Sequence, residues 1–308
     1  MTESTTGSPA APHCGYVAIV GAPNAGKSTL LNQLVGAKIS IVSKKVQTTR
    51  ARITAIAMEG DTQLVFLDTP GIFTPKRRLD RAMVNAAWSG VDDADAVLLL
   101  IDSERGFDDE SRAIIDAFRD RKRKNVLLAL NKVDAVPREK LLGLAKDLSE
   151  AYEFDRVFMI SAQKGTGVDD VRKDLATRMP AGPWLYPEDQ LADVPMRFLA
   201  AEITREQVYR SLHDELPYAI TVETENWKDQ KDGSARIDQV IFVERDGQKK
   251  IVLGEKGQMI KRIGAFARKI MEEQFERRVH LFLFVKVRED WGDDPERYEA
   301  MGLDFPKK

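Results

Sequence analysis

The most constraining feature of this sequence is the segment Gly21-Ala22-Pro23-Asn24-Ala25-Gly26-Lys27-Ser28. It fits the phosphate-binding pattern of a glycine, four residues and then Gly-Lys-Ser. The β-prone run Tyr16–Val20 precedes it, and the residues that follow, Thr29–Leu34, are predicted to form a helix. Glycines allow backbone N–H groups to curl round a phosphate, and the helix directs its positive end toward the anion. The segment therefore predicts a phosphate-binding loop between a strand and a helix.

Two side chains of this loop have specific expected roles. Lys27 is expected to reach the β- and γ-phosphates of a nucleotide, and the Ser28 hydroxyl is expected to ligate Mg²⁺. The alternative is an ordinary glycine-rich turn, but the fixed residues and both flanks agree with the motif.

Length and composition describe a water-soluble chain of two domains. Its 308 residues are enough for two domains, and 43% hydrophobic with 31% charged residues is ordinary for such a protein. The longest apolar runs, such as Ala96–Ile101, are too short to span a bilayer. The first residues, Met1–His13, lack the basic start and apolar core of a signal peptide and are predicted to be a disordered tail. These features favour the cytoplasm.

Cysteine and histidine usage limits other chemistry. Cys14 is the sole cysteine, so no disulfide can form within the chain. Three scattered histidines (His13, His213 and His280) make a zinc site improbable.

Alternating strands and helices predict an α/β fold with a mostly parallel sheet flanked by helices. Ile53–Met58 and Gln63–Leu67 are predicted to form an antiparallel hairpin around Glu59-Gly60-Asp61. Three continuous apolar runs follow, as is typical of parallel strands buried on both faces: Ala96–Ile101, Val126–Leu130 and Val157–Ile160.

Polar motifs follow several of these strands. They are Asp68-Thr69-Pro70-Gly71, Asn131-Lys132-Val133-Asp134 and Ser161-Ala162-Gln163-Lys164-Gly165. Ligands of open α/β sheets bind at the carboxyl ends of the strands, so these motifs and the phosphate loop are expected to meet at one edge.

The residue types in these motifs suit a guanine nucleotide. Asp68 can hold Mg²⁺ through water, and Gly71 can donate its backbone N–H to a γ-phosphate. The Asp134 carboxylate matches the paired N–H donors of a guanine edge, which adenine lacks. Asn131 can tie the neighbouring loops together, and the stem of Lys132 can cover the plane of the base.

In this order, the motifs resemble those of the Ras-like GTPases. Asn24 and the segment Gln47-Thr48-Thr49-Arg50 resemble the bacterial, translation-associated branch that contains the Era family. The resemblance implies that a threonine completes the Mg²⁺ shell with Ser28 and Asp68; we assign it to Thr49, with Thr48 as the alternative. The implied nucleotide-binding residues are Gly21, Ala22, Pro23, Asn24, Ala25, Gly26, Lys27, Ser28, Thr29, Asp68, Thr69, Pro70, Gly71, Ile72, Asn131, Lys132, Asp134, Ser161 and Ala162.

One position departs from the Ras pattern. Ile72 stands where Ras carries a water-orienting glutamine, and an isoleucine cannot hydrogen-bond a water. Resemblance to the Era-like branch implies that Asn24 holds a K⁺ ion near the phosphates, so the expected catalytic residues are Lys27, Thr49 and Asn24. The alternative role for Asn24 is to shape the loop in a left-handed conformation.

The second half of the chain has a different composition. A proline-rich linker begins at Pro180, and a helix over Arg197–His213 is predicted to follow it. Strands are predicted over Tyr218–Glu225, Asp238–Glu244 and Val279–Val287, with a turn at Asp246-Gly247.

The segment Gly254-Glu255-Lys256-Gly257 resembles the Gly-x-x-Gly loop of a KH domain. An aliphatic run precedes it, and apolar residues recur at helical spacing after it. Such a loop clamps the backbone of single-stranded nucleic acid. Between Arg245 and Arg288 there are 12 Lys/Arg and 5 Asp/Glu, an excess of 7 positive charges. The predicted RNA-binding residues are Gly254, Lys256, Gly257, Lys261, Arg262 and Arg268.

Together, these segments resemble the bacterial Era GTPases over nearly the whole chain. The predicted divisions are a disordered tail at 1–13, a GTPase domain at 14–182, a linker at 183–196, a type II KH domain at 197–290 and a C-terminal tail at 291–308. In that tail, Trp291 and Tyr298 are expected either to stack on bases or to pack on the domain.

The resemblance implies a slow GTPase, bound to GTP or GDP and Mg²⁺, that binds 16S ribosomal RNA near its 3′ end during 30S subunit assembly. It also implies peripheral association with the inner membrane and a monomeric state. The alternative function is an RNA-binding module whose GTP/GDP-sensing domain hydrolyses negligibly. A GTPase of tRNA modification is disfavoured, because no cysteine follows Cys14.

Overall fold

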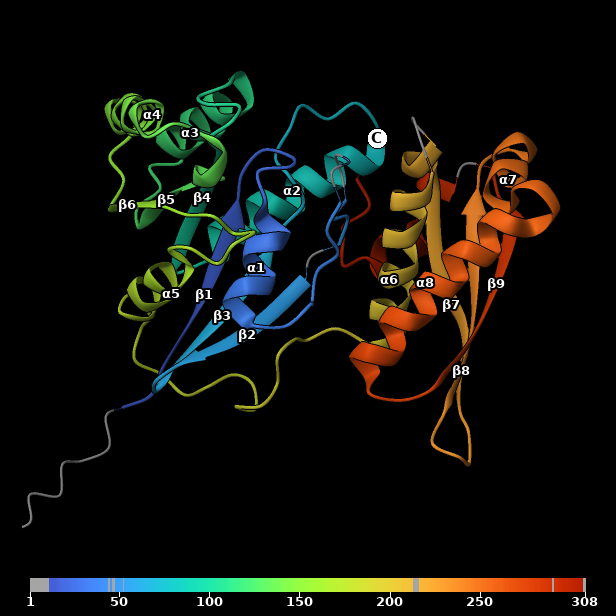
Figure 1. Ribbon diagram of the computed structural model, residues 1–308. Helices are drawn as coiled ribbons and strands as arrows, with labels where there is room; N and C mark the ends of the chain where they lie inside the picture. The colour runs from blue at the N-terminus through green and yellow to red at the C-terminus, as the bar shows by residue number, and fades with distance from the viewer. Residues whose placement is uncertain are drawn as a thin grey trace, which may run out of the picture. The chain divides into compact units, whose positions relative to one another are not determined.

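The chain forms two compact units (Figure 1). The computed structural model describes residues 11–43, 45, 48–51, 53–212, 216–289 and 291–306. The first unit combines Met1–Ala37, Thr54–Asp68 and Trp88–Asp193; the second combines Lys38–Ile53, Thr69–Ala87 and Val194–Lys308. The domain boundaries predicted at 182 and 197 stay a prediction, because these units divide the chain by tertiary contacts rather than at one point.

The start of the chain corrects one expectation. Of the predicted tail, residues 1–10 lie outside the described residues, but His13 already begins strand β1 (His13–Val20). Its Nδ1 lies 2.9 Å from the carbonyl oxygen of Met179, and Cys14 donates its backbone N–H to Pro180. These contacts hold the strand one residue earlier than the composition predicted.

The first unit contains a six-stranded sheet in the order β2-β3-β1-β4-β5-β6. Strand β1 pairs in parallel with β3 and β4, and β5 pairs in parallel with β4 and β6. Only Gly60 and Asp61 connect β2 to β3, and so short a connection allows only an antiparallel pair. The remaining strands are β2 (Ile53–Glu59), β3 (Thr62–Asp68), β4 (Ala96–Asp102), β5 (Val126–Asn131) and β6 (Arg156–Met159).

Helices flank this sheet, as Figure 1 shows. All seven residues of β4 are buried, which is the pattern of a parallel strand covered on both faces. The side chain of Asp108 accepts a hydrogen bond from the Ser111 N–H at 2.9 Å and so caps α3. The helices are α1 (Lys27–Val35), α3 (Asp109–Asp120), α4 (Arg138–Ala151) and α5 (Val168–Ala176); α2 (Arg78–Asp93) contributes only residues 88–93 to this unit.

The second unit contains a three-stranded sheet in the order β7-β8-β9. Strands β7 and β8 are antiparallel, whereas β8 and β9 are parallel. Two apolar clusters join α6 and α8 to the sheet. The elements are α6 (Met196–Ser211), β7 (Ile220–Asp229), β8 (Ala235–Val243), α7 (Asp246–Leu253), α8 (Gln258–Phe275), β9 (Val279–Val287) and α9 (Pro295–Ala300).

Helix α7 replaces the turn predicted at Asp246-Gly247. The side-chain oxygen of Gln248 accepts hydrogen bonds from the N–H groups of Glu244 at 2.8 Å and Arg245 at 3.1 Å. This cap starts a helix at Asp246, and Val252 of that helix is fully buried in the core of the unit. Asp-Gly often marks a turn, but here the Gln248 side chain pairs with the backbone N–H groups just before it, and a helix forms instead.

The C-terminal segment packs within the second unit. Tyr298 and Leu303 are buried against Ala82 and Met83 of α2, with Phe73 partly buried beside them. Trp291 is also buried and donates its indole N–H to the Ala219 carbonyl at 3.0 Å. Of the two roles expected for Trp291 and Tyr298, packing is the one that the structure shows.

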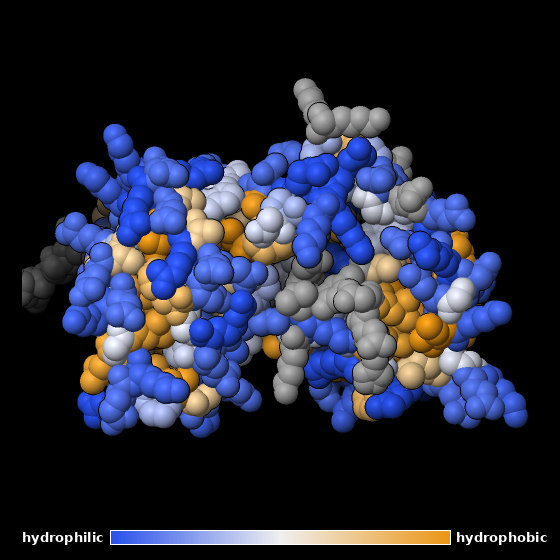
Figure 2. All heavy atoms as spheres, turned by 90° about the horizontal axis from the view of Figure 1, so that it is seen from above, coloured by the Kyte–Doolittle hydropathy of each residue, from blue (hydrophilic) through white to orange (hydrophobic). Residues whose placement is uncertain are grey.

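Hydrophilic residues cover most of the face drawn in Figure 2, with smaller apolar patches among them. Among the described residues, no helix has both the length and the apolar character needed to cross a bilayer.

Candidate nucleotide-binding site and RNA-binding loop

The phosphate loop follows β1 and ends in the first turn of α1. Asn24 has φ 65° and Gly26 has φ 100°, both in the left-handed region. A Cβ atom on Gly26 would lie 2.3 Å from the Nδ2 atom of Asn131, so no larger residue fits there. The loop thus folds tightly enough to present backbone N–H groups to an anion.

Lys27 lies inside this loop. Its Nζ donates hydrogen bonds to the carbonyl oxygens of Gly21 at 3.0 Å and Ala22 at 2.9 Å, and the residue is only 7% exposed. Burial lowers the pKa of Lys27 to about 8, although the Asp68 and Glu110 carboxylates oppose that shift. A phosphate would replace the carbonyl oxygens as the acceptor and favour the charged ammonium.

Ser28 and Asp68 form the part of the predicted metal site that lies in the first unit. The Ser28 hydroxyl donates to the Oδ2 atom of Asp68 at 3.1 Å, and Asp68 is fully buried at the end of β3. Mg²⁺ prefers hard oxygen ligands and takes the rest of its shell from water and phosphate. A hydroxyl and a carboxylate side by side at the phosphate loop therefore fit this ion.

Asn131 ties three loops together, as its position in the motif led us to expect. Its Nδ2 donates to the Ala25 carbonyl at 2.8 Å, and its Oδ1 accepts from the Ala162 N–H at 2.9 Å. Asn131 is the last residue of β5 and is 2% exposed. The phosphate loop and the Ser161-Ala162 segment therefore keep a fixed position relative to the segment Asn131–Asp134, which is predicted to bind guanine.

Asp134 is exposed beside that frame. Hydrogen bonds from the Ser161 side chain and then from Lys164 hold the pKa of the Asp134 carboxyl below its usual value. The Lys164 ammonium lies 3.2 Å from Asp134 Oδ2. A carboxylate that stays ionised is the form that can accept two hydrogen bonds from guanine.

Sequence reasoning missed Asp102. This residue ends β4 beside Asn131 of β5, and its Oδ2 lies 2.5 Å from Nζ of Lys132. The signal was present in the sequence, because an acidic residue directly follows the apolar run Ala96–Ile101. Asp102 belongs to no recognised motif, and its contact with Lys132 depends on the pairing of β4 with β5.

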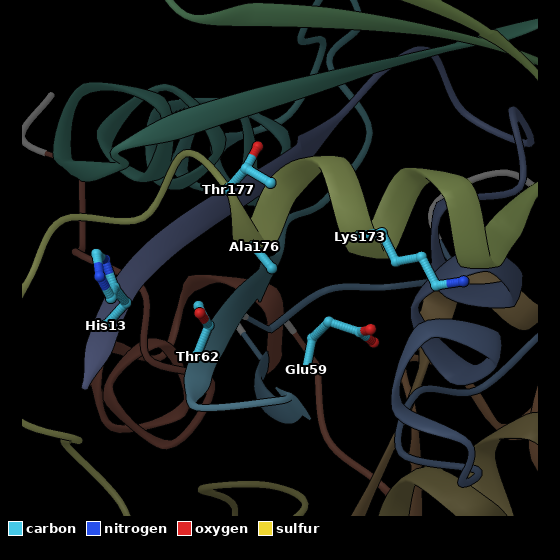
Figure 3. Close-up of a pocket in the computed structure, with 6 residues that line it drawn as sticks. All are labelled: His13, Glu59, Thr62, Lys173, Ala176 and Thr177. Atoms are coloured by element: carbon cyan, nitrogen blue, oxygen red, sulfur yellow. The ribbon is translucent and has the colours of Figure 1, made fainter. Parts of the chain in front are cut away.

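The pocket in Figure 3 lies away from these residues. Its volume is about 340 Å³, and it is lined by His13, Glu59, Thr62, Lys173, Ala176 and Thr177. His13 starts β1, whereas the phosphate loop follows the end of that strand. None of the predicted nucleotide-binding residues lines this pocket, so we do not assign the nucleotide to it.

The second unit carries the nucleotide-site candidates Thr49, Thr69, Pro70, Gly71 and Ile72. Thr49 is 8% exposed, Thr69 is fully buried and Ile72 is 7% exposed. The Thr48 hydroxyl donates to the Lys45 carbonyl at 2.7 Å. Gln47, which helped to define the family pattern, lies outside the described residues.

Charged side chains of α6 hold the segment that carries Thr49. Arg205 donates to the Thr48 carbonyl at 2.5 Å, and Glu206 lies 2.5 Å from the Lys38 ammonium. Arg50 donates to the Tyr209 hydroxyl at 2.7 Å and to the Ile220 carbonyl at 2.8 Å. Sequence reasoning missed these residues, because charged positions on a helix usually face solvent.

The Gly-x-x-Gly loop connects α7 to α8. Gly254, Lys256 and Gly257 have φ values of 70°, 50° and 77°. A Cβ atom on Gly254 would lie 2.6 Å from the Met259 Cβ, so the turn requires glycine there. The side chains of the other predicted RNA-binding residues are exposed: Lys256, Lys261, Arg262 and Arg268.

Family models match segments in both halves of the chain. A family model described as 50S ribosome-binding GTPase matches residues 16–132, and a KH domain model matches residues 215–292. GTPase Era of Brucella suis biovar 1 (strain 1330) is 61% identical over 95% of this chain and 94% of its own. GTPase Era of Bradyrhizobium sp. (strain ORS 278) is 59% identical over 100% of both chains. The chain belongs to the Era family of GTPases.

Two solved Era structures extend the match to the fold. An Aquifex aeolicus Era variant bound to GDP·AlF4⁻ has a TM-score of 0.89 at 38% identity, covering 94% of this chain and 99% of its own. An Era structure with MgGDPNP and nucleotides 1506–1542 of 16S ribosomal RNA has a TM-score of 0.90, with the same identity and coverage. Membership of the Era family makes this chain a GTP-hydrolysing enzyme with a P-loop GTPase domain and a KH domain.

Proposed function

We propose that this Era-family chain hydrolyses GTP and that its nucleotide state controls binding of the 3′ region of 16S ribosomal RNA during assembly of the 30S subunit. One observation carries the proposal for the nucleotide: Asn131, in the segment Asn131–Asp134, hydrogen-bonds both the phosphate loop and the Ser161-Ala162 segment at one edge of the sheet. The Era relative solved with 16S ribosomal RNA supports the RNA half.

The nucleotide contacts follow from the chemistry of each side chain. Lys27 binds the β- and γ-phosphates, Asp134 reads the guanine edge and Lys132 covers the base. Ser28, Asp68 and Thr49 hold Mg²⁺, which when bound neutralises charge on the phosphates. The family resemblance assigns the threonine ligand to Thr49, and Thr48 is the alternative.

Water activation must work without a glutamine after Gly71. Ile72 is apolar and 7% exposed, so it can exclude bulk water but cannot orient a single molecule. Asn24 projects from a left-handed position in the phosphate loop. We assign to its amide oxygen a K⁺ ion that supplies positive charge near the β/γ-phosphates.

The RNA contacts centre on the Gly-x-x-Gly loop. Gly254 and Gly257 allow close approach of a phosphate backbone, because no Cβ atom stands in the way. The exposed Lys256, Lys261, Arg262 and Arg268 neutralise phosphates around it.

A single-turnover hydrolysis assay tests this function. We expect GTP cleavage that is faster in potassium than in sodium at equal ionic strength, and RNA covering the 3′ end of 16S rRNA should change its rate. Asn24→Ala should remove the potassium effect. Equal rates in the two salts would exclude the K⁺ role, and a potassium effect that survives Asn24→Ala would place the ion elsewhere.

The same assay separates the alternative function. Ile72 at the position of the water-orienting glutamine leaves the rate of hydrolysis open. Tight GTP binding with negligible cleavage, with or without 30S subunits, would support the sensor.

The cellular setting is a separate proposal. We infer a cytoplasmic monomer that also associates peripherally with the inner membrane, as the family resemblance implies. Fractionation of cells into cytosol and membranes tests the location, and recovery in the cytosol alone would refute the membrane association. Light scattering of the purified chain tests the monomer.

A further inference from the structure

Asp102 occupies the end of β4 next to the guanine motif. It is paired in parallel register with Asn131, and its side chain is only 7% exposed. Both carboxylate oxygens are used: Oδ2 lies 2.5 Å from Nζ of Lys132, and Oδ1 accepts the N–H of Glu104 at 3.0 Å. The carboxylate is therefore fixed in place by the backbone that follows its own strand.

The ion pair also fixes Lys132. This lysine follows β5 in a left-handed conformation with φ 63° and ψ 33°. Ser103 donates its N–H to the Asn131 carbonyl at 3.0 Å, which holds the two strand ends together. Because its ammonium reaches Asp102, the aliphatic stem of Lys132 crosses from the end of β5 to the end of β4.

We propose that Asp102 is a positioning residue for the nucleotide base, acting by holding the Lys132 stem over the purine ring. A lysine stem is flexible, and ordering it on binding costs conformational entropy. The ion pair orders it beforehand. The inference rests on the proposed function, because it assumes that Lys132 covers the base.

This role differs from that of Asp134. A stem lying on the ring contacts any purine, whereas Asp134 contacts the guanine edge. Loss of Asp102 should therefore lower the affinities for GDP and for IDP by the same factor, although IDP lacks the exocyclic amine. Loss of Asp134 should instead change the ratio of the two affinities.

The variants are Asp102→Ala and Asp102→Asn, with Glu104→Gln as the matched control. The Glu104 carboxylate lies 3.4 Å from the same ammonium but is 53% exposed, so its charge is screened by solvent. Full-length protein is titrated with fluorescent GDP and competed with IDP. We expect Asp102→Ala to lose roughly tenfold in affinity for both nucleotides, Asp102→Asn to lose less, and Glu104→Gln to stay within about twofold.

A double-mutant cycle with Lys132→Ala decides between positioning and a purely structural role. If Asp102 acts through Lys132, then Asp102→Ala/Lys132→Ala binds GDP no more weakly than Lys132→Ala alone. The inference would be overturned if the losses of GDP affinity in the two single variants multiply in the double variant. It would also be overturned if both Asp102 variants bind GDP with unchanged affinity. The nucleotide-free melting temperature is measured in parallel, and Asp102→Asn serves if the alanine variant fails to fold. A wild-type chain that does not bind GDP would refute the proposed function instead.

Discussion

Asp134 carries the recognition of guanine in this site. Hydrogen bonds from Ser161 and Lys164 lower the pKa of its carboxyl, so the group is ionised at neutral pH and accepts hydrogen bonds only. Those same partners orient it, which reduces the reorganisation needed when a base arrives.

We expect Asp134→Asn to weaken GDP binding by about 2–4 kcal/mol, because an amide donor would face the donors of guanine. Xanthine nucleotides should bind better than guanine nucleotides, since their edge offers the complementary acceptor. Competition titration with GDP and XDP measures both. Asp169→Asn on the same unit, where the side chain is 75% exposed, should change neither. Wild-type affinity for GDP in Asp134→Asn would refute the assignment.

Lys27 makes nucleotide binding depend on pH. Its pKa of about 8 in the folded chain lies below the ordinary value for lysine, because burial disfavours the charged form. Between about pH 8 and the ordinary lysine pKa, the folded chain therefore binds fewer protons than the unfolded chain, and the free energy of unfolding rises with pH as the cost of burying the charged ammonium is relieved. Phosphate binding has the opposite preference, because it needs the charged ammonium.

We expect GDP affinity to be flat up to about pH 7 and to fall by several-fold toward about pH 9, with uptake of a proton on binding. Calorimetry in two buffers of different ionisation enthalpy measures that uptake. Lys27→Arg, which stays charged over this range, should abolish the pH dependence even if its affinity is lower. A proton uptake that persists in Lys27→Arg would assign the titration to another group.

At the scale of elements, different residues of the Gly-x-x-Gly loop set its backbone shape and carry its charges. Gly254 and Gly257 set the turn through their backbone angles, whereas Glu255 and Lys256 project from it as exposed side chains. The charges can therefore be changed without altering the glycines that form the turn.

We expect Glu255→Asp/Lys256→Asp to keep the fold and to lower affinity for single-stranded 16S ribosomal RNA at least roughly tenfold, or about 1.4 kcal/mol. The salt dependence should become shallower as phosphate contacts are lost, and GTP binding should not change. RNA titration at two salt concentrations, with circular dichroism as the fold control, measures this. Lys146→Asp on α4, 76% exposed, controls for net charge. Unchanged affinity and slope would remove this loop from the RNA site.

At the scale of the whole molecule, the C-terminal segment forms an apolar cluster with residues 73–86, from the first third of the chain. Tyr298 is 1% exposed, packs edge-on to Phe305 at 4.9 Å and donates its hydroxyl to the Gly292 carbonyl at 2.6 Å. Its neighbours in the cluster include Ala82 and Met83. The segment predicted as a tail is therefore part of a core.

We expect Tyr298→Ala to lower the free energy of unfolding by about 3 kcal/mol, because it leaves a cavity and an unpaired carbonyl. Urea denaturation followed by fluorescence measures the change. Phe284→Ala, where the ring is 50% exposed, should cost less than about 1 kcal/mol. A loss for Tyr298→Ala as small as the loss expected for Phe284→Ala would show that the C-terminal cluster does not stabilise the fold.

The sequence by itself determined the strands of the first unit and the motifs at their ends. Residues that are adjacent in sequence form the phosphate loop, and the continuous apolar runs of β4 and β5 predict buried parallel strands before any contact is known. The prediction that the run Val157–Ile160 is buried on both faces is wrong, because β6 is an edge strand in which only Phe158 is buried. The order of the motifs then placed Asp68, Asn131 and Asp134 at one edge, because parallel strands carry their carboxyl ends to the same side.

The tertiary structure alone decided the contacts between residues far apart in the chain. Asp102 meets Lys132 30 residues later, and Arg205 meets the carbonyl of Thr48 157 residues earlier. A charged residue has the same local pattern whether its partner is water or another chain segment, so local sequence does not mark it as buried. Helix α7 and the burial of Tyr298 have the same origin: a side-chain cap and an apolar partner outweigh the local turn and tail signals.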